Sequence, residues 1–137
     1  LEKREGGLDE MMNDSDVFIG VSKAGLVSQD MVRSMNEGAI VFAMANPDPE
    51  ITEDDAKSAG AAVVATGRSD SVNQLNNVLV FPGLFRGALD ARIEQFDQAM
   101  YVRAAEALAG LVENVEAESI IPSPFDEQVA EVVAAAV

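Results

Sequence analysis

The sequence predicts an α/β fold in which a small parallel sheet is followed by C-terminal helices. Three short runs of nearly continuous apolar residues, at 16–22, 39–45 and 61–67, are typical of strands that are buried on both faces. The segments between these runs carry helix signals. Strand, helix, strand, helix, strand at this spacing indicates βαβ units and therefore a parallel sheet.

The two connecting helices are predicted from their ends. Ser28 suits an N-cap, with Asp30 in the first helical turn, where an acid complements the helix dipole. Thr52 begins the second helix, with Asp55 three residues later. Gly60 lies where a glycine commonly ends a helix. Both connections therefore have a defined helical start.

The pattern changes after the third apolar run. Residues 81–83 (Phe-Pro-Gly) are expected to break the chain, and helices are predicted over 84–93 and 98–112. A third helix is expected to start at Ser123 as N-cap, with Pro124 at its first helical position and an acid at its third. The C-terminal region is therefore predicted to be helical.

Together these elements predict a partial Rossmann-like parallel sheet, the second half of one, with C-terminal helices. We expect residues 1–137 to be the C-terminal portion of a dinucleotide-binding domain, with a half sheet over about 1–82 and a helical region over about 83–137. The N-terminus is charged and does not begin with Met, which favours a chain cut from something longer and not a signal peptide.

Composition excludes several classes of function. The sequence contains no cysteine and no histidine, so disulfides, a Ser-His-Asp triad, cysteine nucleophiles and Cys/His zinc sites are excluded. The lack of cysteine favours the cytoplasm. The net charge of −15 argues against nucleic acid and anionic membranes as partners. No apolar stretch is long enough to span a bilayer.

Ligands of open parallel sheets bind outside the carboxyl ends of the strands, so the loops after the three apolar runs are the candidate site. In the first loop Gly20 lets a ligand approach the backbone closely, although a plain tight turn explains it equally well. In the second, Asn46 can donate to and accept from a carboxylate, a hydroxyl or a ribose. The alternative for Asn46 is an Asx-turn that starts the loop.

Residues 73–77 contain three asparagines and a glutamine, just before an apolar run. Because an apolar run follows, we expect at least one of these amides to turn toward the interior, where an amide is costly unless it is paired. A turn of solvated amides is the alternative. Carboxylates at Asp48 and Glu50 and at 53–55 are conceivable Mg²⁺ ligands, but a structural role is favoured because 53–55 lie in a first helical turn.

An ordered set of motifs resembles the malic enzyme family. The motifs are DVFIGVS at 16–22, FAMANPDPE at 42–50, ATGRSD at 65–70, NQLNN at 73–77, FPG at 81–83 and IIPSPFD at 120–126. The resemblance runs from about Gly7 to the end of the chain and favours the short bacterial and archaeal type. It implies oxidation of L-malate with NAD or NADP, decarboxylation to pyruvate, and a requirement for Mg²⁺ or Mn²⁺.

The resemblance also implies site residues. Those that would contact the substrate are Asn46, Asn76 and Asn77. Those that would contact the cofactor are Gly20, Val21, Ser22 and Asn46. Lys23 and Ala24 stand where relatives commonly have a small residue and proline, and Val72 replaces a usual proline.

No catalytic residue is assigned to this chain. The family's tyrosine acid, lysine base, substrate-binding arginine, metal ligands and glycine-rich pyrophosphate loop precede the matching region, so the chain alone is expected to be inactive. NAD and NADP are not distinguished. Two alternatives stay open: a non-catalytic binding or oligomerisation module, since a half sheet exposes an edge and apolar faces, and another α/β protein that shares the fold alone. Homo-oligomers are expected.

Overall fold

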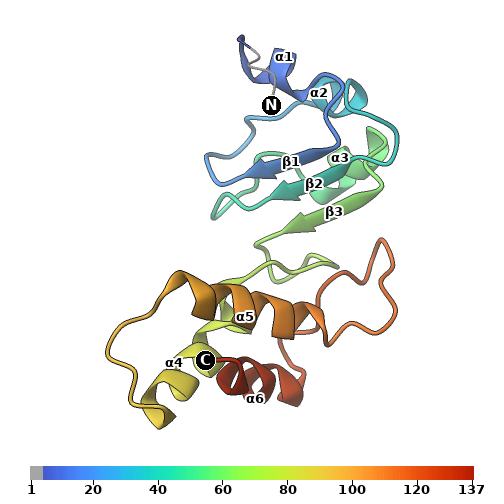
Figure 1. Ribbon diagram of the computed structural model, residues 1–137. Coiled ribbons are helices and arrows are strands. Elements are labelled where there is room, and N and C mark those ends of the chain that lie inside the picture. The colour runs from blue at the N-terminus through green and yellow to red at the C-terminus, as the bar shows by residue number, and fades with distance from the viewer. Residues whose placement is uncertain (1–4) are drawn as a thin grey trace. The chain divides into compact units, whose positions relative to one another are not determined.

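The computed structural model describes residues 5–137 and divides into two compact units, Leu1–Asn73 and Gln74–Val137. We call the first the sheet unit and the second the helical unit (Figure 1). The predicted boundary near residue 82 lies next to the start of the first long helix of the helical unit, at Phe81.

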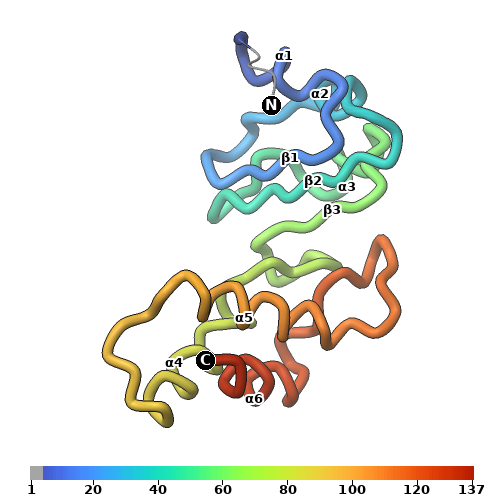
Figure 2. The backbone as a smooth tube through the Cα atoms, viewed as in Figure 1, coloured from blue at the N-terminus to red at the C-terminus, as the bar shows by residue number. Residues whose placement is uncertain are grey.

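The sheet unit alternates short helices and short strands. Its elements are α1 (Leu8–Met12), β1 (Val17–Gly20), α2 (Gln29–Arg33), β2 (Ile40–Ala43), α3 (Glu53–Ser58) and β3 (Val63–Thr66). The three strands are parallel in the order β1-β2-β3, and their arrows point the same way in Figure 1. The predicted α/β fold with a parallel sheet is confirmed. The trace in Figure 2 shows the two connections, 21–39 and 44–62, that return the chain to each next strand.

One face of the sheet carries the core of this unit. Phe18, Val41 and Val64 are paired across the three strands and are all buried. Apolar residues of α1, α2 and α3 pack against them, among them Met12, Val32 and Ala56. All three helices of the unit therefore contribute to the core on this face.

The opposite face is more open than the sequence predicted. Val17 and Ile19 on β1 remain 47% and 60% exposed. The prediction that every strand is buried on both faces is wrong for β1, because its side chains alternate between a covered face and a face that no other described element covers. In β1, therefore, a nearly continuous apolar run does not indicate burial of both faces.

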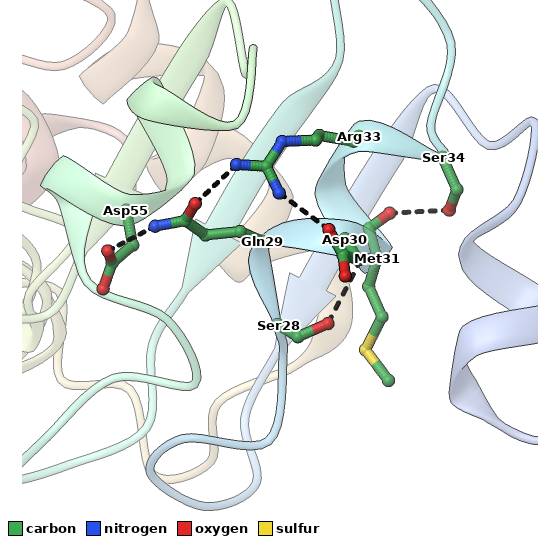
Figure 3. Close-up of polar contacts among 7 residues, drawn as sticks. All are labelled: Ser28, Gln29, Asp30, Met31, Arg33, Ser34 and Asp55. Atoms are coloured by element: carbon green, nitrogen blue, oxygen red, sulfur yellow. Dashed lines mark hydrogen bonds and ion pairs between the residues drawn. The ribbon is translucent and has the colours of Figure 1, made fainter.

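Side-chain caps begin the two connecting helices as predicted. The Ser28 hydroxyl accepts a first-turn backbone N–H of α2 at 3.2 Å, and the Thr52 hydroxyl accepts one of α3 at 3.1 Å. The Gln29 amide donates to the Asp55 carboxylate at 2.7 Å and so joins α2 to α3 (Figure 3). Arg33 in turn donates to Gln29 at 2.6 Å. Two helices of five and six residues are thus held by polar contacts at their ends.

The helical unit consists of η1 (Asn77–Leu79), α4 (Phe81–Asp90), α5 (Gln98–Ala109) and α6 (Glu127–Ala135). Its core consists of Leu79, Leu84, Ala104, Leu108, Val129 and Val133. Gly83 and Gly87 lie on the side of α4 that faces α6, and a Cβ at either position would lie within 3.0 Å of α6 atoms. These glycines therefore allow α4 and α6 to pack closely.

Two predicted helix starts are wrong. Pro82 lies inside the first turn of α4 and does not break the chain, because a first-turn proline removes an N–H that has no helical partner. The last helix is capped by Asp126 and not by Ser123. Ser123 instead starts a turn: its carbonyl accepts the Asp126 N–H at 3.0 Å and its hydroxyl accepts the Phe125 N–H at 3.2 Å.

Among residues 5–137, no helix has both the length and the apolar character that crossing a membrane requires.

Candidate functional site

The candidate site is built on the carboxyl ends of the three strands. Gly20, Ala43 and Thr66 are the last residues of β1, β2 and β3, and the register pairs them directly across the sheet. The loops that follow therefore leave the sheet from the same edge. This is the place where open parallel sheets bind ligands.

The first loop presents two of the predicted cofactor residues to solvent. Val21 is 78% exposed, and Ser22 is also exposed. The backbone N–H of Ser22, however, donates to a carboxyl oxygen of Glu50 at 2.7 Å. Its N–H is therefore engaged inside the protein, and the Val21 side chain and the Ser22 hydroxyl are what this loop offers to a ligand.

Gly20 has a local reason to be glycine. A Cβ built on Gly20 would lie 2.5 Å from Cδ and 2.6 Å from Oε1 of Glu50. The two explanations expected for this glycine were the approach of a ligand and a plain tight turn, whereas the atoms that fill the space are those of Glu50. Gly20 is buried, so within the sheet unit it makes room for a side chain of the second loop.

The second loop carries Asn46, which is exposed just beyond β2 and joined to Pro47 by a cis peptide bond. Within the described chain the Asn46 amide has no hydrogen-bond partner, so an Asx-turn does not use it. A solvent-facing amide at a strand end can bind a ligand hydroxyl or carboxylate. The preceding residue, Ala45, donates its N–H to Glu50 at 3.0 Å.

Glu50 lies between the first two loops, and its contacts were not predicted from the sequence. Its side chain is completely buried, and its two carboxyl oxygens accept the N–H groups of Ser22 and Ala45. Its own carbonyl accepts the Val27 N–H at 3.0 Å. The motif contained the residue, but its partners lie up to 28 positions away, and no local pattern identifies them.

The carboxylates do not form a metal centre in the described part of the chain. Glu50 is occupied by backbone amides, and Asp48 is exposed, 3.6 Å from Arg68. No group of three or more acidic side chains between residues 5 and 137 is placed to hold a metal ion. The structural role favoured for Glu50 agrees with these contacts.

Asn73 is the amide that turns inward, as expected for at least one member of the 73–77 group. It is 1% exposed, and its side chain donates to the Val64 carbonyl at 3.0 Å. Its own carbonyl accepts the Thr66 N–H at 3.2 Å. Asn73 therefore fastens the loop after β3 to the strand itself.

Asn76 and Asn77 belong to the helical unit and differ in their contacts. Asn76 caps η1, and its side-chain oxygen accepts the Val78 N–H at 3.1 Å. Asn77 is the first residue of η1, and its side chain is exposed without a hydrogen-bond partner among the described residues. The two neighbours thus divide into a capping amide and a solvent-facing amide.

A groove of about 780 Å³ lies in the sheet unit beside the loops after β2 and β3. It is lined by several acids, with Lys57 and Arg68 as the basic residues. Arg68 is engaged by Asp70 at 2.7 Å. Excess negative charge disfavours a pyrophosphate there. Gly20, Val21, Ser22 and Asn46 do not line this groove.

One acid of this groove has a shifted pKa. Burial raises the pKa of the Glu53 carboxyl, but hydrogen bonds from Ser71 and Lys57 and the charge of Lys57 together outweigh burial and leave the pKa below its ordinary value. Ser71 donates at 2.7 Å and Lys57 lies at 3.0 Å. Glu53 therefore fastens the start of α3 to the loop after β3.

Comparison with known proteins identifies the family to which this chain belongs. Residues 7–137 match the family model described as malic enzyme, NAD binding domain. The chain is 53% identical over 138 residues to a bifunctional malic/malolactic enzyme of Bacillus subtilis, covering 99% of the chain and 34% of that protein. It is 51% identical to an NADP-dependent malic enzyme of Rhizobium meliloti, covering 87% and 18%.

Solved structures agree in fold. A crystal structure of malic enzyme from Pyrococcus horikoshii matches with a TM-score of 0.90 at 48% identity, covering 96% of this chain and 31% of that one. The chain thus spans about a third or less of the length of these relatives.

Proposed function

Because this chain belongs to the malic enzyme family, we propose that it forms the nicotinamide- and malate-facing wall of an enzyme that oxidises L-malate with NAD or NADP and decarboxylates the product to pyruvate. The whole reaction needs further residues, since the relatives are about three times as long or longer. The isolated chain is therefore expected to be inactive. Its lack of cysteine favours an enzyme of the cytoplasm.

The chain contributes binding and orientation to this reaction. Val21 offers an apolar surface to the nicotinamide ring, while the Ser22 hydroxyl and the Asn46 amide hydrogen-bond its ribose or carboxamide. Asn77 hydrogen-bonds the malate. The bound nicotinamide supplies the chemistry of accepting a hydride from the alcohol carbon. Orienting each bound reactant is what these residues add to the rate.

Asn46 is the observation that carries this proposal. Its amide is solvent-facing at the carboxyl end of β2, without a partner in the described chain, and its neighbour Ala45 is fixed by Glu50. An exposed amide on a fixed backbone suits directed hydrogen bonding to a ligand. Asn76 keeps its place among the proposed substrate residues, although its capping contact makes Asn77 the stronger candidate.

We propose that the Mg²⁺ or Mn²⁺ expected for the family is held by residues outside this chain. The acidic side chains of residues 5–137 form no cluster that suits a divalent ion. We therefore assign no step through a metal to these residues.

A segment exchange tests the proposal. The 137-residue chain would replace the matching third of the Bacillus subtilis relative, and malate-dependent reduction of NAD and NADP would be followed by absorbance. We expect turnover by the folded chimera and none by the isolated chain. A folded chimera without turnover would overturn the proposed function, and turnover by the isolated chain would overturn its dependence on further residues.

In the chimera, Asn77→Ala should weaken the use of malate much more than the binding of cofactor. The exposed amide Gln128→Ala in α6 is the matched control and should change neither. Unchanged malate kinetics in Asn77→Ala would remove Asn77 from the site. The comparison with Asn76→Ala separates binding from capping, because loss of the cap lowers stability in addition.

Association of copies is a second candidate role, favoured by one observation. Val17 and Ile19 expose apolar side chains on the open face of β1, and apolar surface of this kind promotes association. We propose a homo-oligomer on this basis. Sedimentation of the chain should show self-association that Ile19→Lys reduces, and a monomer at high concentration would contradict it.

A further inference from the structure

The buried carboxyl of Glu50 joins the loop after β1 to the loop after β2. It accepts the Ser22 N–H at 2.7 Å from the loop after β1 and the Ala45 N–H at 3.0 Å from the start of the loop after β2. Backbone contacts reinforce the link, because Pro49 and Glu50 accept the N–H groups of Gly25 and Val27 at 3.1 and 3.0 Å. Three hydrogen bonds therefore connect the two loops, and the fourth, from Ala45 to Glu50, lies within the loop after β2.

The contacts of Glu50 coincide with the proposed cofactor wall. Ser22 is itself one of the proposed cofactor residues, and Ala45 immediately precedes Asn46. Fixing these two backbone amides fixes the peptide planes from which Val21, Ser22 and Asn46 project. A buried side chain that touches neither ligand can therefore set the spacing of the groups that do.

Nothing else in the described chain explains why a carboxyl is buried there. Glu50 has no Lys or Arg partner within residues 5–137, so it is not half of an ion pair. Burying an acid in this way is costly unless its oxygens receive hydrogen bonds, and backbone N–H groups supply both. Gly20 leaves the required space, since a Cβ there would overlap the carboxyl group.

We propose that Glu50 is a positioning residue that holds the loops after β1 and β2 in the geometry needed to bind the nicotinamide cofactor. This inference rests on the proposed function. It assigns to Glu50 no contact with substrate or cofactor. Its effect is carried entirely by the backbone of Ser22 and Ala45.

Glu50→Gln is the test, because it keeps the volume but turns an NH₂ group toward a backbone donor. In the isolated chain, hydrogen exchange should show faster exchange of the Ser22 and Ala45 amides, while Val41 and Val64 amides in the strands stay protected. In the chimera, KM for the cofactor should rise about tenfold or more, with a smaller fall in kcat. Glu37→Gln, an exposed acid, is the matched control and should change neither.

Gly20→Ala is a second variant that keeps the carboxyl but displaces it. It should also speed exchange at Ser22 and Ala45 and raise KM for the cofactor, and it decides the matter if Glu50→Gln does not fold. Unchanged exchange at both amides, or faster exchange with an unchanged KM, would overturn the role of Glu50. An unsubstituted chimera without turnover would instead contradict the proposed function. Hydrogen exchange in the isolated chain would still show whether Glu50 holds the Ser22 and Ala45 amides.

Discussion

The two units of this chain hold their backbones by different means. In the sheet unit the helices have five or six residues, and buried polar side chains, Glu50 and Asn73, fasten the loops between the elements. In the helical unit the α-helices have nine to twelve residues and meet through an apolar core and two close-packed glycines. Both units have an apolar core, and in the sheet unit buried polar side chains add specific hydrogen bonds to the loops.

This difference bears on the proposed site residues. Helices of five or six residues are marginal by themselves, so the loops of the sheet unit depend on tertiary contacts for their geometry. Asn46 lies on such a loop, next to a contact of Glu50. Asn77 lies instead on a single helical turn whose last residue, Leu79, is buried in the helical core. The two asparagines are thus positioned independently, one by hydrogen bonds and one by packing.

Truncating the core of the helical unit should have the largest effect. Leu79 is 1% exposed, so Leu79→Ala leaves a cavity and should lower the free energy of unfolding by about 2–5 kcal/mol. Denaturant unfolding measures the loss. Hydrogen exchange should show α4–α6 loosening while β2 stays protected. Equal loss of protection in β2 would show that the two units do not differ in the way described.

Filling the space between α4 and α6 should come next. A Cβ at Gly87 would lie 2.3 Å from the Ala134 carbonyl oxygen, so Gly87→Ala overpacks the interface. The expected cost of about 1–3 kcal/mol exceeds the gain of about 1 kcal/mol from better helix propensity. Gly110→Ala, where the nearest atom is at 3.3 Å, is the control and should be neutral or slightly stabilising. Thermal unfolding distinguishes them, and a more stable Gly87→Ala would argue against close packing.

Removing the Thr52 cap of α3 should lower the free energy of unfolding by less than either change in the helical unit. Thr52 accepts the Asp55 N–H and donates to the Asp55 carboxylate at 2.7 Å. Thr52→Ala should therefore cost about 1 kcal/mol in denaturant unfolding. Thr52→Ser keeps the hydroxyl and should retain most of the stability. Equal losses in the two variants would point to the methyl group of Thr52 and not to its cap.

The smallest expected effect is the loss of stability at acid pH. The pKa of Glu53 is lowered on folding, so its contacts stabilise the sheet unit above the ordinary pKa of 4.5, and that contribution is lost as the pH falls through the lower folded value. Ser71→Ala should therefore destabilise the chain more at pH 7 than at a pH low enough to protonate Glu53 in the folded chain. Denaturant unfolding at both pH values, with exposed Ser69→Ala as control, measures this. A pH-independent effect of Ser71→Ala would contradict it.

Much of the fold was predictable because its signals are local. Three apolar runs marked the strands, and Ser28 and Thr52 marked helix starts, since a cap depends on residues within one turn. Local signals gave a wrong prediction where two possible N-caps lay close together. Ser123 and Pro124 fit a helix start but form a turn before it, and Asp126, three residues later, caps the helix.

The candidate site was predictable to a smaller extent. The apolar run that follows 73–77 predicted an inward-facing amide in this group, and Asn73 is that residue. The sequence did not reveal which carboxylate is buried. Glu50 differs from Asp48 by its partners 28 and 5 positions away, and these depend on how the strands pair. The exposure of Ile19 was missed for a similar reason, because it depends on what covers the sheet.

Gly20 and Glu50 lie thirty residues apart in the sequence but occupy the same space, so a substitution at one position limits which residues the other can accept. A side chain larger than hydrogen at position 20 requires a shorter side chain at position 50. Substitutions at these positions should therefore be non-additive in a double-mutant cycle, and related sequences should vary at them together. A glycine that is kept for such a reason marks an internal neighbour, so its presence beside a binding loop is not by itself a sign of contact with the ligand.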